Sequence, residues 1–96
     1  MKLTELKAIK LAELFSALSD ASRIRLIAVL MDGEMSVRAL ADGVGMTESA
    51  VSHQLRGLRQ KNLVRTRKSG RQVFYSIDDD HVSRLFTLGY DHVQHG

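Results

Sequence analysis

The feature that most constrains the fold is a pair of short helical segments joined by a glycine-containing turn. Ser36 precedes the apolar-periodic segment 37–42, and Thr47 precedes the longer segment 48–61. Serine and threonine favour helix N-caps, so each is expected to begin a helix. Gly43 is expected to end the first of them, because glycine favours the C-terminal end of a helix. Two helices joined in this way form a helix-turn-helix pattern, although any αα-hairpin also fits it.

The residues that follow make the pattern more specific. Segments 63–67 and 72–77 have the composition of strands, and 68–71 between them has that of a turn. A two-stranded hairpin directly after the second helix of a helix-turn-helix makes a winged helix. The sequence therefore predicts a wing at 63–77.

Three further helices complete the prediction. Apolar residues recur at helical spacing over 3–18, and Asp20 is a good N-cap for a helix over 21–31. A last helix is expected over 80–94, after three aspartates. The buried stripe of the second helix is expected to comprise Ile24, Ile27, Ala28 and Met31. The fold class is α+β, mostly α: one winged helix-turn-helix domain over 1–96, with five helices and a two-stranded wing.

Several classes of protein are excluded by what the chain lacks. There is no cysteine, so there is no disulfide framework and no thiolate site. The longest apolar run, 26–31, is far shorter than the roughly 20 residues that cross a bilayer. The first residues turn polar too early for a signal peptide. We expect a cytoplasmic protein with no membrane partner, and a core this small favours oligomerisation.

Charge is distributed unevenly along the chain. The formal net charge is only +3, yet residues 49–77 contain no Asp or Glu and hold half of the 14 Lys and Arg. A solvated basic surface is the alternative interpretation, but such segregation favours a nucleic-acid face. Bases are expected to be read by Ser49, Ser52, His53 and Gln54. Phosphates are expected to be bound by Arg56 and, in the wing, by Arg65, Arg67, Lys68 and Arg71.

Three of the four histidines fall at the end of the chain. His92 and His95 are neighbours on one helix face, but His81 precedes His92 by 11 positions, or roughly 16 Å of helix. Ligands of one zinc ion lie within about 4 Å of one another. An antiparallel partner helix would bring His81, with Asp79 as a fourth ligand, beside His92 and His95 of a second chain. Symmetry then gives two sites per dimer. From the residues alone, ordinary surface histidines remain an equal alternative.

These residues resemble a known family. The segments 49–58 and 73–77, together with 20–23, look like the ArsR/SmtB family of bacterial metal-sensing repressors, over nearly the whole chain. In its zinc-sensing, CzrA-like branch the last helix carries Asp-x-His, ten residues, then His-x-x-His or His-x-x-Glu. That spacing matches Asp79, His81, His92 and His95 without a gap, which favours the ligand interpretation.

The resemblance implies a function. It implies a homodimer, formed through the N- and C-terminal helices, that binds double-stranded operator DNA when metal-free. Zinc, two ions per dimer, would release the DNA and derepress an efflux or sequestration gene. Cobalt and nickel are second choices, because the extra ligands of those sensors are absent. Met35, Ser36 and Val37 stand where some members carry sensing cysteines, which argues against that type of sensor.

Two other functions compete with this one. The first is a winged-helix repressor tuned by cobalt, nickel or a non-metal signal, with zinc only structural; whether zinc weakens operator binding separates the two. The second is a zinc hydrolase, which needs an open coordination position that four protein ligands do not leave. We therefore expect no enzymatic activity and no small organic substrate. The role of Glu48, an acid at the start of the DNA-reading helix, stays open.

Overall fold

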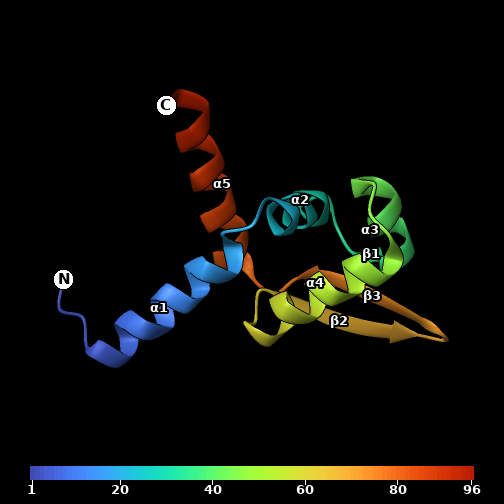
Figure 1. Cartoon of the computed structure of the whole chain (residues 1–96), viewed down its shortest axis with the longest axis horizontal. Coiled ribbons are helices and arrows are strands. Elements are labelled where there is room, and N and C mark those ends of the chain that lie inside the picture. Colours follow the sequence, from blue (N-terminus) through green and yellow to red (C-terminus); the bar gives the residue numbers. More distant parts are fainter.

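The computed structural model describes all residues, 1–96, as five helices and a small sheet (Figure 1). The winged helix-turn-helix prediction is confirmed. In chain order the elements are α1 Glu5–Leu18, α2 Ala21–Leu30, β1 Met35–Ser36, α3 Val37–Val44, α4 Glu48–Gln60, β2 Val64–Ser69, β3 Gln72–Ile77 and α5 Asp80–His95.

Helix ends follow capping chemistry. The Ser36 and Thr47 hydroxyls each accept from a backbone N–H three residues on, at 3.1 Å, as the sequence predicts. Asp20 is the N-cap residue of α2, as predicted, and has extended backbone, but its carboxylate makes no capping hydrogen bond. The predicted end of α3 at Gly43 is wrong. Gly45, with φ +69°, is the left-handed cap, because α3 continues for two further residues.

The sheet has a third strand that the sequence did not predict. The order is β1-β3-β2, and both pairings are antiparallel. Strand β1 is only two residues long, too short to leave an alternating pattern. The hairpin turn is also tighter than the predicted 68–71, because Ser69 still pairs with Gln72. Gly70, with φ +62°, begins the two-residue turn, a position where such hairpins favour glycine.

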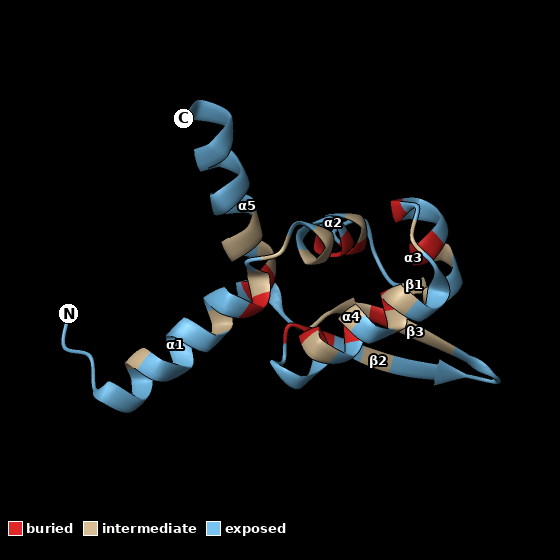
Figure 2. Ribbon diagram, in the orientation of Figure 1, coloured by how far each residue is buried: buried red, intermediate tan, exposed pale blue.

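The core lies between α2, α3, α4 and the base of the wing. Its fully enclosed side chains include Leu26, Ile27, Leu40, Leu55 and Leu58. Figure 2 shows buried segments on α2, α3 and α4. The predicted buried stripe of α2 is correct only at Ile27. Leu26 and Leu30 are buried in place of Ile24, Ala28 and Met31. Apolar residues occur around much of α2, so periodicity alone could not identify the face that meets α3.

The first and last helices project from this core, and we call them the two arms (Figures 1 and 2). The radius of gyration is 14.2 Å. A compact chain of this length is expected to have about 12.5 Å. Large apolar side chains of the arms lie open, including Phe15 at 51% and Val93 at 77% exposure. No helix is both long and apolar enough to cross a membrane.

Candidate DNA-binding and metal-binding sites

The helix-turn-helix is held together by polar contacts from α2. The Arg25 guanidinium donates to the carbonyl of Val44 at 2.9 Å, at the C-terminal end of α3. That end of a helix leaves carbonyls unpaired and attracts cations. The Gly45 turn follows directly and leads to Thr47, the N-cap of α4. The position of α4 relative to α2 and α3 is therefore fixed before any partner binds.

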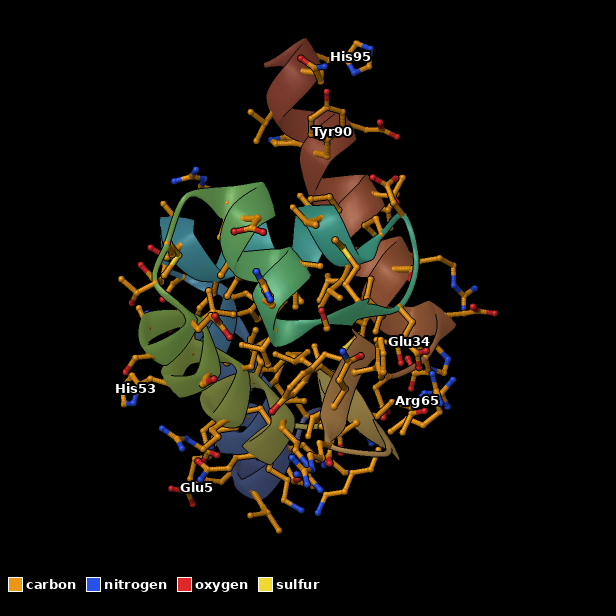
Figure 3. All side chains as sticks on the ribbon, turned by 90° about the vertical axis from the view of Figure 1, so that its right-hand side faces the viewer. Glu5, Glu34, His53, Arg65, Tyr90 and His95 are labelled. Carbon is orange, nitrogen blue, oxygen red and sulfur yellow. The ribbon has the colours of Figure 1, made fainter.

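Helix α4 presents a polar face to solvent. Ser49, His53 and Arg56 are exposed, Ser52 is half-buried, and none of the four uses its side chain in a hydrogen bond within the chain. Figure 3 shows His53 on the outer side of the molecule, away from the core. These side chains are free to meet a ligand, as the sequence prediction of a DNA-reading helix requires.

Gln54 differs from its neighbours on α4. Its side-chain oxygen accepts from the Nε of Arg23 at 2.8 Å, and Arg23 also donates to the carbonyl of Ala17 at 3.1 Å. One guanidinium thus joins the end of α1 to the DNA-reading helix. The oxygen of Gln54 is occupied by Arg23, which leaves the amide nitrogen as its remaining polar group.

The basic residues of the wing divide into two kinds. Lys68 and Arg71 are exposed at the tip, and neither makes an ion pair or a side-chain hydrogen bond. Arg65 donates only a long bond, 3.4 Å, to the hydroxyl of Ser76. Arg67 is instead paired with Glu34 at 2.7 Å. Figure 3 shows Glu34 and Arg65 near each other beside the wing.

A tight turn connects α4 to the wing. Asn62 has φ +59°, a left-handed conformation that asparagine tolerates better than most residues. The N–H of Asn62 donates to the Arg59 carbonyl and that of Leu63 to the Leu58 carbonyl, both at 3.0 Å. This pair of bonds is the Schellman motif. Because Leu58 and Leu63 are both buried, the joint between helix and wing is packed as well as bonded.

The N-terminal end of α5 places two predicted metal ligands together. Oδ1 of Asp79 lies 3.6 Å from Nδ1 of His81. The same oxygen caps the helix by accepting from the N–H groups of His81 and Val82, at 2.9 and 3.2 Å. These bonds, that from Val82 first, and the charge of His81 lower the pKa of the Asp79 carboxyl. The ionised carboxylate keeps its second oxygen free.

His92 and His95 lie at the other end of the same helix, and both are exposed. Nδ1 of His95 is 2.7 Å from the Asp91 carbonyl, which can only accept, so the lone pair of His95 is on Nε2. Metal-binding histidines usually donate the N–H of their other ring nitrogen to an acceptor in this way. No three His, Asp or Glu side chains of one chain come together, so the four donors fit a metal only as two separate pairs.

An apolar groove of about 440 Å³ separates the arms from α2. It is lined by nine hydrophobic residues and a glycine, among them Phe15, Ile24, Phe86 and Val93. Ile24 is 37% exposed and faces this groove instead of the core. The groove begins near the core and continues along the exposed half of α5.

This arrangement defines the class of protein: a winged helix-turn-helix with a free polar face on its second helix. Residues 20–66 match the family model described as bacterial regulatory protein, arsR family. The chain belongs to that family.

Individual relatives agree with the family model. The chain is 49% identical over 92% of its length to a transcriptional repressor SmtB homolog of Synechocystis, of which it covers 67%. It is 37% identical over 84% of its length to a cadmium resistance transcriptional regulatory protein, CadC homolog, of Staphylococcus aureus, of which it covers 68%. A homodimeric winged helix-turn-helix domain from Mycobacterium bovis superposes with a TM-score of 0.86 at 29% identity, over 98% of this chain and 90% of that one.

Sequence reasoning missed the polar residues that hold the site in place. Arg23, Arg25 and Glu34 each contact residues between 6 and 33 positions away. No local pattern marks them, because their partners lie on other elements. Only the charge of Glu34, an acid just before the basic wing, could have suggested a pairing.

Proposed function

We propose that this protein is a metal-responsive transcriptional repressor. Its homodimer binds operator DNA when metal-free, and zinc at two inter-subunit sites on α5 lowers DNA affinity. The observation that carries the proposal is the position of the donors: Asp79 and His81 at one end of an exposed helix, and His92 and His95 at the other.

The dimer is supported by the apolar surface of the arms. Phe15, Leu88 and Val93 are more than half exposed in the single chain, and the groove beside them has almost no polar lining. Contiguous apolar surface of this kind marks an interface. A second copy packed antiparallel along α5 covers it and brings the two donor pairs together.

The DNA face is supported by side chains that have no partner within the chain. In the proposed complex, Ser49, Ser52 and His53 read bases, together with the amide nitrogen of Gln54. Arg56, Lys68 and Arg71 bind phosphates. Glu48 is exposed in the first turn of α4, where an acid also interacts favourably with the helix dipole.

The metal ion is supported by the chemistry of the donors and by a relative. One carboxylate and three imidazoles are a tetrahedral set suited to zinc. Imidazole is also a suitable ligand for nickel, so nickel and cobalt remain the second choices. The relative from Staphylococcus aureus is described as a cadmium resistance regulator. Zinc would supply an inter-subunit cross-link that favours one dimer arrangement. It can lower DNA affinity only if it binds that arrangement more tightly than the DNA-bound one.

Subunit exchange tests the shared site. One variant carries Asp79→Asn and His81→Ala, where the asparagine keeps an N-cap; the other carries His92→Ala and His95→Ala. Neither homodimer holds a complete site. After mixing, each heterodimer should recover about one high-affinity zinc, because symmetry leaves one interface with all four ligands.

The readout is zinc competition against a chromophoric chelator, with heterodimers counted by native mass spectrometry. A His53→Ala protein, which loses a histidine outside α5, should keep two zinc ions per dimer. Heterodimers that form without recovering zinc would refute the shared site.

A second measurement tests the regulation. A duplex selected from a random pool by the metal-free protein serves as operator, and its affinity is measured with and without zinc. We expect zinc to weaken binding by about 5- to 150-fold, the usual range of allosteric coupling. Unchanged affinity would make the zinc structural only.

A further inference from the structure

An ion pair crosses the outer face of the three-stranded sheet. Arg67 on β2 is the cross-strand partner of Phe74 on β3, which in turn is paired with Ser36 on β1. Glu34 immediately precedes β1. The Arg67 side chain therefore extends over the central strand to reach a residue at the opposite edge. Its guanidinium carbon lies 4.9 Å from the centre of the Phe74 ring.

The contact uses the edge of Arg67 that would bind a phosphate. Nη2 donates to Oε1 of Glu34 at 2.7 Å, and Nε donates to Oε2 at 3.1 Å and Oε1 at 3.2 Å. Such forked pairs take up the planar edge with which arginine recognises carboxylates and phosphates. A phosphate approaching Arg67 would also meet the negative charge of Glu34. The pKa of that carboxyl is lowered, first by the hydrogen bond from Arg67 and further by the charges of Arg67 and Arg65, against the effect of burial.

The outer part of the wing makes few contacts with the rest of the domain. Its buried side chains, Val64 and Tyr75, lie at its base, and residues 67–73 include none that is buried. Strand β1 holds β3 through only two residue pairs. Among the residues of the outer hairpin, Arg67 alone makes a side-chain hydrogen bond to the body of the domain. Without that bond, the hairpin beyond Thr66 is held to the domain only by the pairing of Phe74 with Ser36 and by the partly buried Val73.

We propose that Arg67 is a positioning residue of the wing and makes no phosphate contact. Its ion pair with Glu34 over Phe74 holds the hairpin at a fixed angle, so that Lys68 and Arg71 meet the DNA backbone. This inference rests on the proposed DNA-binding function, and it assigns Arg67 a different role from that expected from the sequence.

The sign of the mutational effects tests the proposal. Arg67→Gln removes a positive charge from the wing, and Glu34→Gln removes a negative one. If Arg67 bound phosphate, the first substitution would weaken DNA binding and the second would strengthen it. A positioning role predicts that both weaken binding, by up to about fivefold, the most that an exposed ion pair contributes. The double variant should be no weaker than either single one, because both remove the same contact.

Salt dependence gives the second readout. The probe is a 30-base-pair duplex of random sequence, whose binding is measured at several salt concentrations. Lys68→Gln should reduce the slope of log K against log salt by about 0.9 per wing. Arg67→Gln should leave that slope unchanged. A slope reduced equally by Arg67→Gln, with tighter binding by Glu34→Gln, overturns the proposal.

Amide exchange of the free protein separates this proposal from the DNA-binding function. Arg67→Gln and Glu34→Gln should accelerate exchange of the same β2 and β3 amides, whereas Lys68→Gln should not. An unchanged slope in Lys68→Gln would remove the wing from the DNA interface and so contradict the proposed function. Unchanged exchange in Arg67→Gln and Glu34→Gln would overturn the positioning role, whatever the DNA measurements show.

Discussion

The arms and the centre of the molecule are built from similar helices but are completed to different degrees. Helix α1 buries one of its 14 residues and α5 one of 16, whereas α4 buries three of 13 and α3 three of eight. Contacts within the chain therefore bury the apolar faces of α3 and α4 but leave most residues of the arms exposed to solvent. The centre buries its apolar residues within one chain, whereas in the proposed dimer a second copy buries the apolar faces of the arms.

The difference has a thermodynamic meaning. Interactions within the centre stabilise a single chain at any concentration, while interactions made by the arms depend on how much protein is present. Variants of the two regions should therefore respond differently to dilution.

Leu55→Ala tests the centre. Leu55 is fully enclosed on α4, so truncation leaves a cavity and should lower the free energy of unfolding by about 2–5 kcal/mol. Urea denaturation measures the loss, and sedimentation at concentrations where the variant is folded should show an unchanged monomer–dimer equilibrium. A loss below about 1 kcal/mol would mean that the centre is packed less tightly than described.

Phe15→Ala tests the arms. Phe15 is 51% exposed in the single chain and lines the groove. If a second copy covers it, truncation removes about 1.5–3 kcal/mol of burial and raises the dimer dissociation constant about tenfold to hundredfold. Thr87→Ala, at an exposed position of α5 outside the groove, is the control. Equal dissociation constants for Phe15→Ala and the control would contradict the interface.

A pair of glycines sharpens the comparison. A Cβ added at Gly57 on α4 would meet only the Arg23 guanidinium at 4.0 Å, and one added at Gly89 on α5 would meet nothing. Alanine in a helix interior is more stable than glycine by about 0.5–1 kcal/mol, so Gly57→Ala should gain that amount. Gly89→Ala should gain less, because Gly89 lies in the groove that a second copy covers in the proposed dimer. If thermal denaturation shows equal gains in stability for the two variants, α5 is exposed to solvent in solution and the proposed interface is contradicted.

Acid should loosen the wing and leave the centre folded. Because hydrogen bonds from Arg67 lower the pKa of Glu34, the ion pair stabilises the wing above the ordinary glutamate pKa of about 4.3. That contribution is lost as the pH falls through the lowered value in the folded protein. The protection factors of the wing amides, which correct for the intrinsic effect of pH on exchange, should therefore fall in this range. Glu34→Gln should show low wing protection at every pH, and wild-type protection factors that do not change in acid would contradict the assignment.

Local signals in the sequence predicted most of the fold. The caps at Ser36 and Thr47 and the glycine turn of the wing act over a few residues, so their patterns are visible without coordinates. Wrong predictions arose where distant partners decide the outcome. The buried face of α2 is decided by the elements packed against it, and the short strand β1 exists only because β3 lies beside it.

The candidate sites divide in the same way. Helical periodicity predicts that the α5 donors occupy two ends of one helix, and the structure has a helix of that length, Asp80–His95. The sequence could not predict which basic residues are paired within the chain, because the partner of Arg67 is 33 residues away and that of Arg23 is 31 residues away. Charge counts treat Lys68 and Arg67 alike, whereas hydrogen bonding separates them.

The joint at Asn62 limits how any signal can reach the DNA. With Leu63 bonded to Leu58, and Asp78 bonded back to Leu63 at 3.1 Å, α4 and the base of the wing share no hinge. In the proposed complex, each protomer then offers DNA a helix that is rigidly joined to the base of its wing. In the proposed homodimer, the remaining adjustable quantity is the separation of two such bodies. Neighbouring major-groove half-sites lie about 34 Å apart. In the proposed mechanism, DNA affinity therefore depends on whether the two α4 helices of the dimer stay at that separation.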